Sequence, residues 1–374
     1  MTITISWQRK SGTQNGYVML GLIVILGIAA LTVFVSRLNA TAIHNDQARK
    51  TTSALAVAKQ ALIGSAAASN TRPGAQPCPD TDNDGQSNLT AGACAAPLGR
   101  LPWRTLGLPD LRDAAGERLW YVLSPNFQDI PANAINSTVG GQLSVSGTIS
   151  ASNVVAVVFA PGNAIGTQTR EAAKTNNAGA YLESYVAGVI TAREQDGTYN
   201  DDLSVITPAD IFSVVEKRIA QEVQHALKNY YDLSANQYPY PALASACTAV
   251  LCLADTAAPL QQGALSGRIP AKPTPGDAGS TYPADAATGQ PSLLGSGTWF
   301  DTNGWRYVFN YLVDPNCVMA SASCGTLSSS YTNASTYGDS PYNVANVKGV
   351  LQFTVPNTVS PGDGVRMFYA RGLN

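Results

Sequence analysis

Three aspartates at alternate positions are the residues of this chain best suited to binding a metal ion. Asp80, Asp82 and Asp84 precede Gly85 in the pattern D-x-D-x-D-G, which opens the calcium-binding loop of EF-hands. The twelfth position of that loop supplies a bidentate glutamate, and this chain has Ala91 there, so an EF-hand is not expected. A calcium loop closed by other oxygens and a turn held by side-chain to backbone hydrogen bonds both remain open.

Six cysteines form the second set of residues with a defined chemistry. They fall into three pairs that are close in sequence, and short loops favour pairing between neighbours, although other connectivities are open. Zinc is the alternative, but no C-x-x-C spacing occurs and His44 and His225 lie outside any ligand-like cluster. Disulfides are therefore expected, which indicates an oxidising compartment such as a periplasm or the cell exterior. The expected pairs are Cys78 with Cys94, Cys247 with Cys252, and Cys317 with Cys324.

Other chemistries have little support in the sequence. No nucleophile elbow, phosphate-binding loop, dinucleotide fingerprint or HExxH motif occurs, so an enzyme is not expected. The net charge of −2 and the lack of a basic run argue against nucleic-acid binding, which requires clustered Lys and Arg. With 45% apolar and 13% charged residues over 374 positions, the chain should fold, and its length allows two domains.

The apolar segment Tyr17–Val35 determines where the rest of the chain would lie relative to a membrane. It contains no charged residue and would span about 28 Å as a helix, close to the thickness of a bilayer core. A cleaved secretory signal is one interpretation, because Arg9 and Lys10 supply a basic start, but no clean A-x-A cleavage site follows the run. A membrane-spanning helix over about 17–36 is therefore expected.

The residues just before this segment support a third interpretation. A hydrophilic stretch, Met1 to Asn15, ends at Gly16, and the aromatic Tyr17 opens the apolar run. This order resembles the class III signal of type IV pilins and type II secretion pseudopilins. The resemblance implies that a prepilin peptidase removes the leader 1–16, cutting between Gly16 and Tyr17 and methylating the new N-terminus. The apolar helix would then stay in the mature protein.

One position departs from the pattern of that family. Subunits of the filament shaft carry a glutamate at the fifth position after the cut, where this chain has Gly21. In the family this carboxylate is thought to pair with the N-terminal amine of a neighbouring subunit, in apolar surroundings where an unpaired charge is costly. Its absence implies a subunit that needs no neighbour above it, as at the tip of a filament.

A block of motifs between residues 77 and 121 strengthens the resemblance. It contains PCPD and DG in Pro77–Gly85, LPW-x-TLGLP in Leu101–Pro109, and D-x-x-G-x-x-x-x-Y in Asp113–Tyr121. This order is similar to that of a group of proteobacterial prepilin-type proteins. The last part is similar to the DPWGNPY-like stretch of major pseudopilins, although Ala115 stands where that pattern has tryptophan. The resemblance implies a pilin-like head, and several pseudopilins hold structural calcium.

The remaining pattern predicts an α+β fold with a long helix over 17–70 and a head over 71–206. Ala58 and Leu62 belong to an approximate helical stripe, and β-branched runs such as Val154–Gly162 are typical of strands. The resemblance implies that the long helix serves as a transmembrane and filament helix and packs on an antiparallel sheet in this head.

A second helix is predicted over 207–231, at the start of a β-rich region covering 207–374. Thr207 is a capping residue, and Asp210 suits the exposed N–H groups of a helix start. Motifs of the first half recur weakly after this helix, including a D-x-x-G-x-R pattern at 301–306. A duplicated pilin-like head and a chance similarity both remain open.

The sequence therefore predicts a minor pilin or pseudopilin, a structural subunit at or near the tip of a type IV pilus or type II secretion-like filament. The expected partners are other subunits through the N-terminal helix, a prepilin peptidase, and the inner membrane before assembly. The expected location is the bacterial inner membrane, crossed once with the C-terminal part in the periplasm, and then the filament. The alternative is a membrane-anchored exported adhesin or binding protein that never joins a filament.

Overall fold

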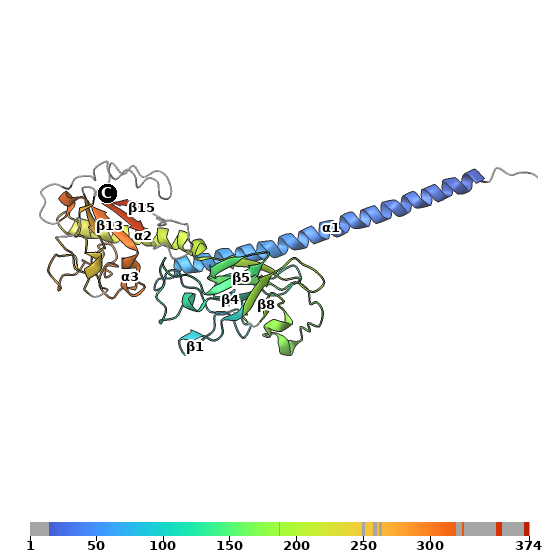
Figure 1. Cartoon of the computed structure of the whole chain (residues 1–374), viewed down its shortest axis with the longest axis horizontal. Coiled ribbons are helices and arrows are strands. Elements are labelled where there is room, and N and C mark those ends of the chain that lie inside the picture. The colour runs from blue at the N-terminus through green and yellow to red at the C-terminus, as the bar shows by residue number, and fades with distance from the viewer. Residues whose placement is uncertain are drawn as a thin grey trace, which may run out of the picture.

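The computed structural model describes residues 15–186, 188–248, 251–256, 260–261, 264–318, 324, 349–353 and 370–373. It shows an α+β fold in which two lobes follow one another along two helices, and one long helix projects from the first lobe (Figure 1). Residues 1–14 of the predicted leader lie outside the described residues.

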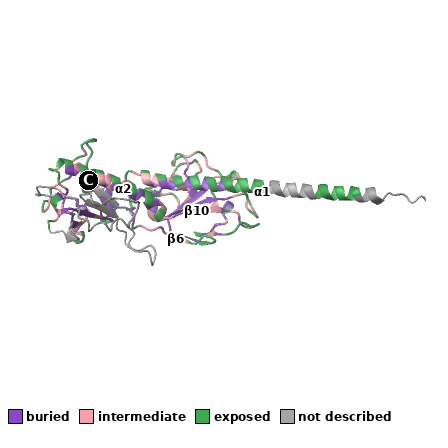
Figure 2. Cartoon of the chain, turned by 90° about the horizontal axis from the view of Figure 1, so that it is seen from above, coloured by how far each residue is buried: buried purple, intermediate pink, exposed green. Residues whose placement is uncertain are grey.

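Helix α1 runs from Asn15 to Ala68 and is 54 residues long. It contains no proline, and its last third is rich in alanine, the strongest helix former. Leu55, Ala58, Leu62 and Ala66 recur at helical spacing and are buried against the first lobe. The N-terminal half of the helix projects away from both lobes (Figure 2).

The structure contradicts the expected membrane-spanning helix over 17–36. Among the helices of the described residues, none holds a stretch long and apolar enough to cross a membrane. The inner-membrane location and the transmembrane role of the helix are corrected on the same ground.

The first lobe has two sheets packed face to face. Its central sheet is antiparallel, with the strand order β10 (Asp202–Ile206), β7 (Ala156–Ala160), β4 (Trp120–Leu123) and β3 (Leu98–Arg100). Helix α1 contacts β7 and β10. An apolar layer that includes Trp120 and Ile190 joins the other face to a second sheet. That sheet has the order β6 (Ala151–Val154), β5 (Leu143–Gly147), β9 (Val189–Ala192) and β8 (Tyr185–Val186), with β5 and β9 parallel. Strands β1 (Leu89–Thr90) and β2 (Ala93–Cys94) form a small ribbon.

Helix α2 runs from Pro208 to Leu233 and leads into the second lobe. Thr207 accepts the Asp210 backbone N–H at 3.3 Å and donates its own N–H to the Asp210 carboxylate at 2.8 Å, so a capping box sets the start of the helix. Helix α2 contacts an antiparallel sheet with the order β11 (Leu260–Gln261), β12 (Ala264–Gly267), β13 (Phe309–Val313), β14 (Gly349–Phe353) and β15 (Ala370–Leu373).

Short helical turns connect these elements. They are α3 (Trp299–Thr302) and the 3₁₀ turns Pro125–Phe127, Ala172–Lys174, Ala178–Ala180, Ala244–Ala246, Trp305–Tyr307 and Pro315–Cys317.

The two lobes share a strand order and a register. Three cross-strand neighbours occupy equivalent positions in the two sheets: Gly99, Tyr121 and Val158 in the first, and Gly267, Tyr311 and Leu351 in the second. Both lobes also tie the segment after the helix to the 3₁₀ turn after the central strand, with backbone N–H bonds from Gln76 to Phe127 at 2.8 Å and from Tyr238 to Cys317 at 2.7 Å. A helix packed on an antiparallel sheet in this register therefore occurs in both lobes.

Helix α2 joins the lobes because its first half packs on the end of α1. Arg218 donates to the carbonyls of Ala67 and Ser69, the latter at 2.7 Å. These carbonyls lie at the C-terminus of α1, where the helix macrodipole favours a cation. Lys59 of α1 also pairs with Asp210 of α2 at 3.0 Å.

Candidate functional site

The predicted processing junction lies at the start of α1. Gly16 and Tyr17 belong to the first turn of this helix. At Gly21, a Cβ would have no heavy atom within 4 Å. A glutamate there would meet no obstacle close to its Cβ, so the fold itself does not require glycine. Cleavage after Gly16 and methylation of Tyr17 stay predictions.

The segment after this junction exposes an apolar surface. Seven large side chains between positions 20 and 28 are each 52% to 69% exposed, on a helix that projects into solvent (Figure 2). Successive helical residues are about 100° apart, so this run covers every side of the helix. An exposed apolar surface on every side of a helix is a candidate interaction site. The residues are Leu20, Leu22, Ile23, Val24, Ile25, Leu26 and Ile28.

Asp80 organises the D-x-D-x-D-G turn. It is 1% exposed, and its carboxylate accepts backbone N–H bonds from Asp82, Asn83 and Gly85 at 3.2, 2.6 and 2.7 Å. Burial raises the pKa of Asp80, and the N–H donors of Gly85 and Asn83 oppose that shift because they stabilise the ionised form. Arg118 donates to the Asn83 carbonyl at 2.7 Å and so ties the turn to the approach to β4. The turn is closed by hydrogen bonds of its own residues.

The same turn is the candidate calcium site. Asp80, Asp82 and Asp84 each offer a ligand atom within 4.8 Å of the others. However, Asp84 already accepts two bonds from Gln86, at 2.7 and 3.0 Å, and Asp80 accepts the backbone bonds of the turn. Calcium takes about six to eight oxygen ligands, and the three aspartates supply three at one ligand atom each. The donor set fits a hydrogen-bonded turn better than a calcium site, and calcium binding stays a prediction.

The structure joins the six cysteines in three local pairs, Cys78–Cys94, Cys247–Cys252 and Cys317–Cys324. The first pair fastens the segment that precedes the aspartate turn to β2. The second closes a short loop at the surface of the second lobe, where Leu251 is 58% exposed and Cys252 is fully buried.

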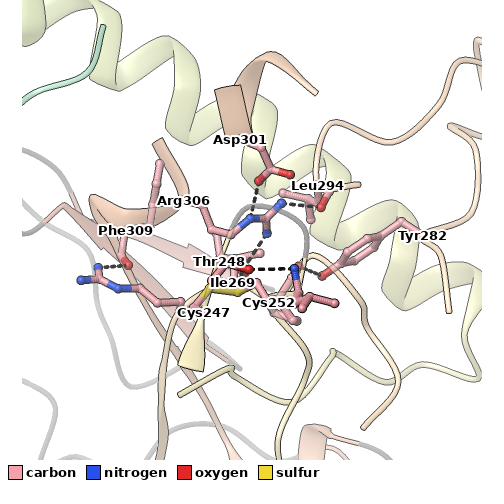
Figure 3. Close-up of a disulfide and its surroundings, with 12 residues drawn as sticks. Cys247, Thr248, Cys252, Ile269, Tyr282, Leu294, Asp301, Arg306 and Phe309 are labelled. Carbon is pink, nitrogen blue, oxygen red and sulfur yellow. Dashed lines mark hydrogen bonds and ion pairs between the residues drawn. A yellow bond between two sulfur atoms is a disulfide. The ribbon is translucent and has the colours of Figure 1, made fainter. Parts of the chain in front are cut away.

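A fully buried arginine lies beside this second disulfide (Figure 3). Arg306 pairs with Asp301 at 2.5 Å and donates to the carbonyls of Ile269 and Leu294, both at 2.7 Å. All its contacts are thus made within the lobe. The D-x-x-G-x-R pattern at 301–306 therefore serves the fold of the second lobe.

Sequence reasoning missed a second buried arginine, in the first lobe. Arg100 is 3% exposed, and its guanidinium lies 4.1 Å from the ring centroids of both Trp120 and Tyr181. Burial lowers the pKa of Arg100 to about 10, so the side chain stays charged at neutral pH. The cation between two rings fixes the loop that carries Tyr181 over the central sheet. No local motif marks this role, because the two rings come from distant parts of the chain.

Asp201 and Asp202 are adjacent in sequence but take part in different hydrogen bonds. Asp201 is 2% exposed and accepts the backbone N–H groups of Glu183 and Ser184 at 2.8 and 2.7 Å. Asp202 accepts a bond from Gln195 at 3.1 Å. Burial raises the pKa of Asp201 to about 7. This burial has a structural role, since the Asp201 carboxyl anchors the loop at Glu183 and Ser184 to the start of β10.

Comparison with known proteins adds no neighbour for this chain. The sequence matches no family model and no curated protein, and the structure matches no solved structure. The pilin-like interpretation therefore depends on the motifs of the sequence and on the geometry described above.

Proposed function

We propose that this protein is a minor structural subunit, at or near the tip of a filament of the type IV pilus or type II secretion kind. It joins other subunits through the N-terminal half of α1. The observation that carries the proposal is that one part of this helix packs on the first lobe and another part is exposed. One face of its last third is buried on the first lobe, whereas Leu20 to Ile28 expose apolar side chains around the helix. Burial of this surface among other helices, at about 25 cal/mol per Å², drives assembly.

Two further features support the proposal. The three disulfides suit an exported protein, because such bonds persist in oxidising compartments. The second lobe lies beyond the C-terminal end of α1, at the opposite end of the molecule from the exposed apolar segment (Figure 1). Subunits that pack on that segment then meet one end of the molecule only. Together with Gly21, this supports a terminal position in the filament.

Coexpression with an active prepilin peptidase tests the proposal, with intact mass and N-terminal sequencing as the measurement. We expect a mature chain that begins at a methylated Tyr17. Gly16→Leu is the control variant, and it should stay uncut because the residue before the cleaved bond is changed. A wild-type chain that still begins at Met1 would reject the filament proposal. It would favour an exported adhesin or binding protein that functions outside a filament.

A further inference from the structure

The two lobes meet at the loop Ile130–Gly140 of the first lobe. Asn303, at the end of α3, donates to the Thr71 carbonyl at 2.8 Å and accepts the Ile135 N–H at 3.3 Å. Asn136 donates from its side chain to the Asn303 carbonyl at 2.7 Å. Asn303 is 2% exposed, so these bonds form inside a packed interface. Two of these three bonds come from the loop and therefore depend on its staying in place.

Glu216 of α2 contacts the same loop. The Ser137 hydroxyl donates to Glu216 Oε1, and Glu216 is 1% exposed. Its other carboxyl oxygen, Oε2, has no hydrogen-bond partner among the described residues. A single donor does not offset the cost of burying an ionised carboxylate. Burial raises the pKa of Glu216 to about 8, and the hydrogen bond from Ser137 opposes this shift.

Charged groups on the surrounding elements are engaged elsewhere. On α2, Arg218 binds the end of α1, and Asp210 pairs with a lysine of α1. In the second lobe, Asp301 and Arg306 pair with each other. The loop itself has no ionisable side chain from 131 to 140. Among the described residues, the cations named here, Arg218, Lys59 and Arg306, are thus engaged with groups other than Glu216.

We propose that the contact between Glu216 and Ser137 is a proton-dependent latch between the two lobes. With Glu216 protonated, the latch holds the junction loop on α2. Loss of the proton leaves a buried charge with one donor, and the loop is released together with the bonds that Ile135 and Asn136 make to Asn303. The packing of α2 on α1 and the bond from Asn303 to Thr71 persist, so the change is confined to the loop and its two bonds to the second lobe. The latch belongs to the single chain and does not depend on filament assembly.

Hydrogen exchange of the full chain, measured by mass spectrometry at pH 6 and pH 9, tests the latch. After correction for the intrinsic pH dependence, we expect peptides covering 131–140 to exchange about tenfold faster at pH 9 in the wild type. The reason is that each pH unit above the pKa of Glu216 disfavours its protonated form tenfold. Glu216→Gln keeps an acceptor for Ser137 and has no proton to lose, so its protection should be equal at both pH values.

Two further variants complete the test. Asp201→Asn removes another buried carboxyl with a raised pKa, away from the junction, and its 131–140 peptides should respond to pH as in the wild type. Ser137→Ala deletes the contact itself, so exchange should be fast already at pH 6. A pH response in Glu216→Gln equal to that of the wild type overturns the proposal. If Glu216→Gln does not fold, Ser137→Ala provides the test. Protection of its 131–140 peptides at pH 6 equal to that of the wild type also overturns the proposal.

Discussion

Asp80 accepts three backbone N–H bonds within its own turn while almost fully buried. Asp80→Ala leaves these donors unsatisfied inside the lobe, so we expect the free energy of unfolding to fall by about 2–4 kcal/mol. Asp82→Ala, at an exposed position of the same turn, should change it by less than about 0.5 kcal/mol. Urea unfolding followed by circular dichroism measures both variants. Equal effects would show that Asp80 does not organise the turn.

The aspartate turn also leads to a prediction about calcium. Because Asp80 and Asp84 already accept N–H bonds, we expect millimolar calcium to change the melting temperature by less than about 1 °C. A calcium ion bound only by the folded state would raise it by several degrees, because such binding stabilises the fold by mass action. Differential scanning calorimetry with calcium, with magnesium and with a chelator distinguishes these outcomes. A rise with calcium alone would restore the calcium-loop interpretation.

At the scale of elements, the junction of α1 and α2 depends on Arg218. Its guanidinium reaches the last carbonyls of α1 from a helix that starts at Pro208, 140 positions after α1 ends at Ala68. We expect Arg218→Ala to lower the free energy of unfolding by about 1–3 kcal/mol, because two half-buried carbonyls at the end of α1 lose a charged donor. Arg193→Ala, which breaks an exposed pair with Asp196, should have an effect below about 1 kcal/mol. Chemical unfolding compares the two, and equal losses would contradict a special role for Arg218.

The exposed part of α1 leads to a separate prediction about self-association. Ile25 is 69% exposed in the middle of the apolar segment. We expect the wild type to form oligomers in detergent-free solution and Ile25→Asp to shift them towards monomer, since a charge in an apolar contact is costly. Lys50→Ala, on the exposed polar part of the same helix, should leave the distribution unchanged. Sedimentation velocity measures it, and a monomeric wild type would argue against assembly through this segment.

Elements with local signals were predictable from the sequence, whereas contacts between distant segments were not. Thr207 and Asp210 mark the start of α2 because both partners of the capping box lie within one turn. Arg100 and Arg218 carry no such mark, since their partners Trp120, Tyr181 and Ala67 come from other elements. The membrane assignment was wrong because it was based on the apolar composition of the sequence alone, whereas no helix among the described residues is long and apolar enough to cross a membrane.

For the whole molecule, two buried carboxyls contribute to the pH dependence of stability. Burial raises the pKa of Asp201 from its ordinary value of 3.8 to about 7 and that of Glu216 from 4.5 to about 8. At a pH between the ordinary and the raised pKa of each carboxyl, the folded protein keeps a proton that the unfolded chain releases. Stability from these groups is therefore complete below about pH 4 and is lost as the pH rises through 7 and 8. This direction is opposite to that of a carboxylate in an ion pair.

We therefore expect the free energy of unfolding to decrease by a few kcal/mol between pH 5 and pH 8.5, in excess of any change in a variant that carries both Asp201→Asn and Glu216→Gln. The variant keeps the hydrogen-bond acceptors of both side chains and removes their protons, so its stability should vary less over this range. Urea unfolding at a series of pH values gives both curves. Parallel curves would mean that the two carboxyls titrate alike in the folded and unfolded states. In that case neither could act as a pH-sensitive element of the fold, and the wild type would owe its pH dependence to groups nearer the surface.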